Sequence, residues 1–145
     1  MNFIFKSIDR YQLASPKNAD DQSRKFFTEI LILDVKKPLS LNFNGGLWFE
    51  SGSIKIHVGT EDNFIPARKA QPAIEVENLN DFKQHLMTKH ISLTEDGRLP
   101  GANRIYFSDP FGNRNIGMEI IKSGSIYLGP AFVVYLFLFL FPEPQ

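Results

Sequence analysis

Few side chains in this sequence could carry out chemistry, and the histidines are the first to consider. Cysteine is absent, which excludes thiol nucleophiles, thiolate metal ligands and disulfide bonds. His57 lies where apolar and polar residues alternate, so it is either a metal ligand or a solvent-facing or hydrogen-bonded side chain. His85 and His90 fall on a predicted helix, where we expect surface and terminal positions. No segment matches a phosphate-binding loop, a dinucleotide fingerprint or a nucleophile elbow, so those enzyme classes are not indicated.

A cation and an aromatic residue are the other candidates for binding a ligand. Arg10 is charged at effectively any pH, so it cannot ligate a metal, but it could hold a carboxylate or phosphate through two hydrogen bonds. The alternative is a salt bridge to Asp9, Glu50 or another acid. Trp48 could line a ligand cleft with Phe49, although aromatic residues in strands more commonly fill the core. Both alternatives stay open at this point.

The composition is that of an ordinary single-domain globular protein. The chain has 145 residues, of which 43% are hydrophobic and 22% charged, enough to bury most of its unfolded surface in one core. Sixteen basic residues balance sixteen acidic ones, so there is no electrostatic footprint for nucleic acid. The first ten residues contain no apolar signal-peptide region, and we expect a cytoplasmic protein.

The order of predicted elements divides the chain into two similar halves. In the first half, a strand over residues 8–14 precedes a helix over residues 20–31 with apolar side chains at helical spacing. A strand over residues 31–35 follows. A hairpin of two further strands, over residues 47–50 and 54–58, completes the half, and its short connection contains Gly52.

The second half repeats this order of elements. A strand over residues 72–76 precedes a helix over residues 79–89, which Asn78 caps. A short strand over residues 91–94 and a final hairpin follow. A repeat of roughly sixty residues is too long for a solenoid and suits two fused βαβββ modules. The predicted fold class is therefore α+β, with one domain over residues 1–122 and modules at about 8–60 and 70–122.

The final hairpin carries the most specific pattern of the chain. It reads Arg104-Ile-Tyr-Phe-Ser-Asp-Pro-Phe-Gly-Asn-Arg114, where Pro110 ends the first strand and Gly112 and Asn113 supply positive φ angles for a tight turn. With Tyr11-Gln-Leu-Ala-Ser-Pro16 and Gly46-Leu-Trp-Phe-Glu-Ser-Gly52, it closely resembles the vicinal-oxygen-chelate superfamily. That superfamily includes glyoxalases, extradiol dioxygenases, fosfomycin-resistance proteins and bleomycin-binding proteins. The resemblance implies two curved sheets that enclose a cleft for a small molecule.

The resemblance also implies where a metal ion would bind. In metal-binding members, one side chain from the first and last strand of each module holds a divalent ion, and these ligands are His, Gln or Glu. The four positions fall on Arg10, His57, Gln71 and Ile116 of this chain. His57 is a good ligand and Gln71 a poor one, whereas Arg10 is a cation and Ile116 has no donor atom. A divalent metal is thus an option with an incomplete ligand set, and we expect no cofactor.

Glu119 is the nearest acid on the last strand and the weak candidate for a catalytic carboxylate. Because side chains alternate along a strand, Glu119 should point away from the face that carries Ile116. A one-residue bulge would be needed to bring it into the cleft. With that bulge, the metal ligands would be His57, Gln71 and Glu119.

The resemblance leaves three functions open. One is a glyoxalase-like lyase or isomerase, or a dioxygenase, in which a metal ion assists reaction of a small oxygen-rich substrate. Another is a metal-free binding protein, similar to the bleomycin-binding relatives, in which Arg10, His57 and Gln71 contact the ligand and Trp48 stacks against it. The third is a degenerate copy without activity.

Residues 123–145 form a hydrophobic tail of unclear role. The apolar run is shorter than the roughly 20 residues of a membrane-spanning helix, and Gly129 and Pro130 interrupt it. The tail could pack on its own domain, pair with a second chain or cause aggregation, so a homodimer is one option.

Overall fold

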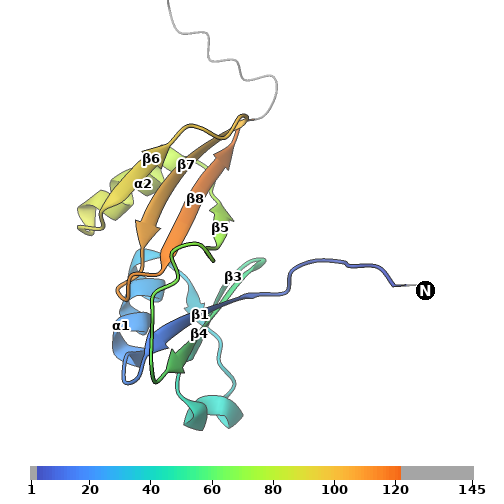
Figure 1. The fold of residues 1–145 in the computed structure, drawn as a ribbon, viewed down its shortest axis with the longest axis vertical. Helices are drawn as coiled ribbons and strands as arrows, with labels where there is room; N and C mark the ends of the chain where they lie inside the picture. The colour runs from blue at the N-terminus through green and yellow to red at the C-terminus, as the bar shows by residue number, and fades with distance from the viewer. Residues whose placement is uncertain (1–2, 122–145) are drawn as a thin grey trace, which may run out of the picture.

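The computed structural model describes residues 3–121, with the side chains of residues 42–44 excepted. The elements fall into two halves that repeat the order strand, helix and three strands (Figure 1). No helix within residues 3–121 is long and apolar enough to cross a membrane. The hydrophobic tail predicted over residues 123–145 lies outside the described residues.

The N-terminal module forms a four-stranded sheet with the strand order β1-β4-β3-β2. Its elements are β1 (Tyr11–Pro16), α1 (Asp20–Lys25), the π-helix η1 (Phe26–Ile30), β2 (Asp34–Val35), the 3-10 helix η2 (Leu39–Asn44), β3 (Leu47–Ser51) and β4 (Ile54–Glu61). β1 runs parallel to β4, whereas β3 is antiparallel to both of its neighbours. The helix predicted over residues 20–31 is confirmed by α1 and η1 together.

The C-terminal module forms a second four-stranded sheet with the equivalent order β5-β8-β7-β6. Its elements are β5 (Ala73–Glu75), α2 (Leu79–Thr88), β6 (Leu93–Asp96), β7 (Ala102–Ser108) and β8 (Arg114–Ile120). β5 pairs in parallel with β8, as β1 does with β4 in the first module. The predicted fold class, α+β with two βαβββ modules, is therefore confirmed.

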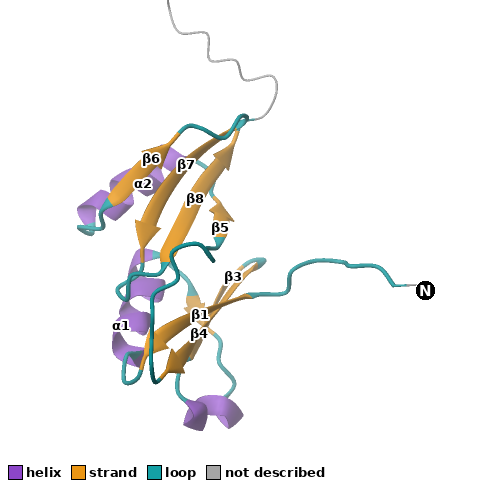
Figure 2. Ribbon diagram, in the orientation of Figure 1, coloured by secondary structure: helices purple, strands orange, loops and turns teal. Residues whose placement is uncertain are grey.

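The helices of both modules cover one face of the sheets and share a single hydrophobic core. Figure 2 shows α1 and α2 on the same side of the strands. A hydrogen-bond contact of 2.8 Å between His85 Nε2 and the Ile30 carbonyl joins the two helical segments. The most deeply buried apolar side chains of this core are Phe26, Phe27, Phe49, Ile56, Leu86 and Ile105. Within residues 3–121, helices cover only one face of each sheet, and we call the other face the open face.

The first strand lies further along the chain than its sequence suggests. Residues 8–10 do not pair, and β1 begins at Tyr11, opposite Ile56 of β4. The strand continues through Pro16, which pairs with Glu61. β1 is an edge strand, and an edge position tolerates a proline because its missing N–H would face away from the sheet. The prediction that this strand ends before Pro16 is therefore wrong.

The turn of the final hairpin is held by a buried asparagine. Gly112 has a φ of +88°, as predicted, but Asn113 does not have a positive φ, so that part of the prediction is wrong. The Asn113 side chain is fully buried and donates to the Ala14 carbonyl at 2.8 Å, while its Oδ1 accepts from the Ala67 N–H at 2.9 Å. Its amide nitrogen Nδ2 also donates to Asp109 at 2.7 Å. Asn113 therefore ties the hairpin of the C-terminal module to the first strand of the N-terminal module.

The tightest backbone approach in the N-terminal module is at Gly46, which leads to a prediction about stability. Gly46 has a φ of +70°, and a Cβ there would lie 2.3 Å from the Val58 carbonyl oxygen. Gly52 has a φ of +57° but open space around it. Both Gly→Ala changes incur a left-handed backbone cost of about 1–2 kcal/mol, and only Gly46→Ala adds a clash with backbone.

We therefore expect Gly46→Ala to lower the free energy of unfolding by roughly 1–3 kcal/mol more than Gly52→Ala does. Urea unfolding followed by the fluorescence of Trp48, the single tryptophan, measures both variants against the unmodified protein. Equal losses in the two variants would show that the contact between Gly46 and β4 is not as close as the structure has it.

Candidate functional site

The register of β3 and β4 decides which side chains reach the open face of the N-terminal module. Leu47 pairs with Val58 and Phe49 with Ile56, and these four side chains belong to the core under the helices. Trp48 pairs with His57 between them. Since neighbouring residues in a strand point to opposite faces, Trp48 and His57 lie together on the open face.

Trp48 and His57 form a stacked pair. Their ring centroids are 4.0 Å apart and the two planes differ by 9°. His57 is only 7% exposed, because the indole covers one face of the imidazole. Burial lowers the pKa of His57 below its ordinary value of 6.5, and the positive charge of Arg10 lowers it further. The imidazole is therefore neutral at pH 7. In this form one ring nitrogen donates a hydrogen bond and the other accepts one.

Arg10 lies on the same side of the sheet as His57 but is already engaged by an acid. Although it precedes the first residue of β1, its charge acts on His57, and it shares the Asp9 carboxylate with Lys55 of β4. Its guanidinium donates to Asp9 at 2.5 Å, and Lys55 Nζ lies 3.4 Å from the other oxygen of the same carboxylate. These two cations lower the pKa of Asp9. Of the alternatives for Arg10, the salt bridge to Asp9 is present.

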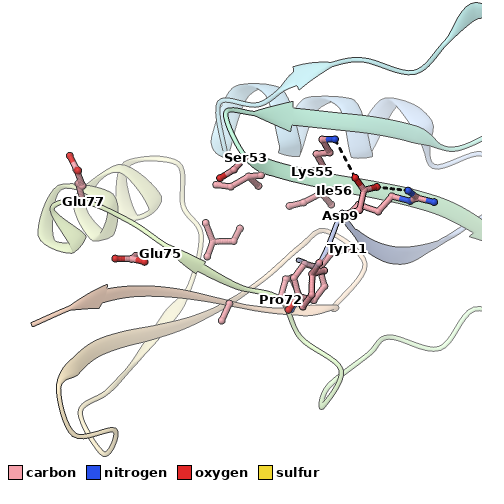
Figure 3. A pocket seen from close by; sticks show the side chains of 13 residues that line it. Asp9, Tyr11, Ser53, Lys55, Ile56, Pro72, Glu75 and Glu77 are labelled. Atoms are coloured by element: carbon pink, nitrogen blue, oxygen red, sulfur yellow. Dashed lines mark hydrogen bonds and ion pairs between the residues drawn. The ribbon is translucent and has the colours of Figure 1, made fainter. Parts of the chain in front are cut away.

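A pocket of about 440 Å³ lies at the junction of the two modules. Figure 3 shows Asp9 and Lys55 on one wall, with Pro72 and Glu75 on the segment that forms the opposite wall. The apolar lining comprises Ile8, Tyr11, Ile54, Ile56, Pro72 and Ile74. Charged groups of both signs surround this lining: Arg10 and Lys55 come from the N-terminal module, and Glu75 and Glu77 come from the C-terminal module. This volume and mixture of surfaces are typical of a site for a small organic molecule.

The structure separates the residues that the sequence proposed as one site. Arg10 lines the junction pocket, whereas Trp48, His57 and Gln71 do not line it. Gln71 immediately precedes the pocket residue Pro72, and its Oε1 is buried without a hydrogen-bond partner. A buried acceptor of this kind normally binds water or another donor. Trp48 and His57 instead make a separate surface on the open face beside the pocket.

Glu119 lies on the helix-facing side of its sheet. The register of β7 and β8 is unbroken: Ile105 pairs with Gly117 and Asn103 with Glu119, so the bulge that would turn Glu119 inward does not form. Glu119 Oε1 accepts a hydrogen bond of 2.9 Å from the backbone N–H of Asn78, the residue that caps α2. Ile116 occupies the opposite face and pairs with Tyr106. Glu119 therefore supports the start of α2 and cannot act as a metal ligand or catalytic carboxylate beside His57.

The remaining donor set does not fit a divalent metal. Two of the four positions implied by the superfamily are occupied by the cation Arg10 and the hydrocarbon Ile116. No group of three histidine, aspartate or glutamate side chains converges within the described residues 3–121. A cation at a ligand position repels a divalent ion, so His57 and Gln71 alone would have to offset that repulsion.

A cluster of polar residues on the C-terminal module was missed in the sequence. The Asp96 side chain is 3% exposed and accepts hydrogen bonds from Arg98, Arg104 and Tyr106, at 2.8, 2.6 and 2.8 Å. These donors hold the pKa of Asp96 well below its usual range. The guanidinium of Arg114 lies 5.3 Å from the centre of the Tyr106 ring. The signal available in the sequence was the period of two that places Arg104 and Tyr106 on one face of β7.

Comparison with known proteins identifies the family. No family model and no curated protein matches the chain. A solved structure from Bacillus anthracis, assigned to the glyoxalase family, is 39% identical and superposes with a TM-score of 0.79. The match covers 83% of this chain and 99% of that protein. The chain therefore belongs to the glyoxalase family of the vicinal-oxygen-chelate superfamily.

More distant structures share the fold. The fosfomycin resistance protein FosX from Listeria monocytogenes is 12% identical, with a TM-score of 0.65 over 80% of this chain and 94% of its own. A glyoxalase family protein from Enterococcus faecalis is 18% identical, with a TM-score of 0.62 over 79% of this chain and 98% of its own. At these identities the likeness concerns the architecture alone.

The stacked pair makes the protonation of His57 visible in the fluorescence of Trp48, the single tryptophan. We expect a fluorescence change on acidification with a midpoint below pH 6.5, because the pKa of His57 is lowered from that value. The unfolded chain binds this proton more readily, so His57 should lower the free energy of unfolding as the pH falls below 6.5. His57→Gln should abolish the fluorescence transition, and His90→Asn, at an exposed histidine, should retain it. A midpoint above 6.5 would contradict the burial of His57.

Proposed function

We propose that this protein is a metal-independent member of the glyoxalase family that binds a small organic molecule in the pocket between its modules. The proposal is supported by the pocket of about 440 Å³, together with Arg10 and Ile116 at two positions where the resemblance to the superfamily implies metal ligands. A binding protein needs only the pocket, whereas the metal-assisted reaction also needs the ion.

The lining of the pocket indicates the class of ligand. Its apolar surface, from Ile54, Ile56 and Ile74, suits a hydrocarbon or aromatic body. Lys55 and Arg10 share the single carboxylate of Asp9, so two cations against one acid favour an anionic end on that module, while Glu75 on the other favours a cationic end. The arrangement best suits a small molecule that carries opposite charges on an apolar body, as an apolar amino acid does.

A glyoxalase-like lyase or isomerase is the second candidate. It is favoured by the lowered pKa of His57, since a neutral imidazole at pH 7 can act as a general base. In that case Arg10 would stabilise negative charge that develops on the substrate. The two candidates differ in the fate of the bound molecule, which a binding protein releases unchanged.

Binding can be tested with L-phenylalanine and L-leucine, using saturation-transfer NMR on the full chain. We expect both to bind more strongly than phenylalanine amide, which lacks the carboxylate, and N-acetyl-phenylalanine, which lacks the ammonium group. Ala73→Phe should reduce binding at least about tenfold, because Ala73 lines the pocket and the added ring fills it. Ala70→Phe, at an exposed alanine outside the pocket, is the matched control. Binding that is equal in both variants, or absent for every probe, would contradict the proposal.

A further inference from the structure

A second pocket, of about 310 Å³, lies on the C-terminal module and shares no residue with the junction pocket. Thr94 pairs with Tyr106, and Ser108 pairs with Arg114, so these four side chains line the pocket from three adjacent strands. Ser92, just before β6, completes the polar lining. No carboxylate lines this pocket, whereas acidic side chains line the junction pocket. An anion in the second pocket would therefore meet one guanidinium, three hydroxyls and no opposing charge.

Within residues 3–121, Arg114 differs from the neighbouring arginines in making no salt bridge to an acid. Arg98 and Arg104 both bind the carboxylate of Asp96. Among the described residues, none of the salt bridges involves Arg114, and its guanidinium instead lies 5.3 Å from the centre of the Tyr106 ring. Its backbone N–H donates to the Ala67 carbonyl at 2.9 Å, which fixes the start of β8. The guanidinium is thus positioned by an aromatic ring while its donors stay available to a ligand.

The local charge is positive despite the buried acid. Arg98 and Arg104 bind the single carboxylate of Asp96, and Arg104 and Arg114 lie over the Tyr106 ring, so three guanidinium groups accompany one carboxylate. Tyr106 donates its hydroxyl proton to Asp96 at 2.8 Å, and the Arg114 guanidinium lies against the ring of the same residue. The excess of cations over anions favours an anionic ligand at Arg114, the half-buried member of the group that makes no salt bridge among the described residues.

The three hydroxyls are available as further donors. The hydroxyls of Thr28 and Thr88 bond backbone carbonyls of their own helices. Those of Ser92, Thr94 and Ser108 make no such bond within the part of the chain that the structure describes. Each can donate one hydrogen bond, and a guanidinium presents two parallel N–H groups to an oxyanion. A tetrahedral phosphate group has enough acceptor oxygens to engage all of these donors.

We propose that the pocket formed by Ser92, Thr94, Tyr106, Ser108 and Arg114 binds the phosphate group of a small molecule or free phosphate. The site is independent of the proposed function, because it shares no residue with the junction pocket. Arg114 supplies the charge and the bidentate contact, and the hydroxyls of the flanking strands orient the remaining oxygens.

The test is a titration of the isotopically labelled full chain with inorganic phosphate, phenyl phosphate and acetate at constant ionic strength. The Arg114 Nε–H signal and the amides of Ser92, Thr94 and Ser108 should shift saturably with both phosphates, and more weakly with acetate. Arg114→Gln should weaken phosphate binding at least tenfold, and Arg114→Lys should restore part of it. Tighter binding of phenyl phosphate than of inorganic phosphate would identify a phosphorylated small molecule as the ligand, and the reverse would identify free phosphate.

Two further variants keep the test decisive if the loss of Arg114 disturbs the fold. Thr94→Val combined with Ser108→Ala removes two hydroxyls and retains the charge, and it should weaken phosphate binding several-fold. Arg68→Gln removes an exposed arginine outside the pocket and should leave binding unchanged. The proposal is overturned if phosphate binds equally well to Arg114→Gln, or if Arg68→Gln weakens binding as much.

Discussion

The packing of a shared helical layer against one face of both sheets fixes which side chains this protein can offer to a ligand. Phe49, Ile56 and Ile105 are buried beneath the helices, so the residues between them in each strand must face the other way. This alternation puts Trp48 beside His57 and puts Ile116 on the face opposite to Glu119. It also assigns Glu119 to the helical side, where it supports the start of α2. Moving any of these residues to the opposite face would require its strand to shift its pairing by one residue, and that shift would expose the core side chains.

Within that arrangement of strands, the open faces of both modules carry arginine side chains. Arg10 takes the place of a neutral or anionic ligand, and its charge lowers the pKa of His57. A fixed guanidinium can stabilise an anionic group, as a metal ion does, but it offers hydrogen bonds in place of open coordination positions. On the C-terminal module, Arg114 beside Tyr106 presents the same kind of group. These two arginines are the basis on which we propose ligands with anionic groups for both modules.

Features set by local pattern could be predicted from the sequence, and features set by pairing between distant segments could not. Helical spacing predicts both helices, and Pro110 with Gly112 predicts the final turn. The start of β1 depends on its partner β4, so the unpaired residues 8–10 look like strand in the sequence. Asp96 precedes Gly97 and resembles a loop residue, yet it ends β6 because Arg104 and Tyr106 of the next strand bind its carboxylate. The stacking of Trp48 on His57 likewise requires the register between two strands.

The central claim is that Arg10 and Ile116 prevent this member of the family from binding a metal ion. It is tested most directly by calorimetric titration of Ni²⁺ and Zn²⁺ into the purified protein and into the double variant Arg10→His with Ile116→Glu. This variant supplies two donors of the required type beside His57 and Gln71. The account predicts no stoichiometric binding to the unmodified protein and about one ion per chain in the double variant. Stoichiometric binding to the unmodified protein that disappears in His57→Ala would contradict it.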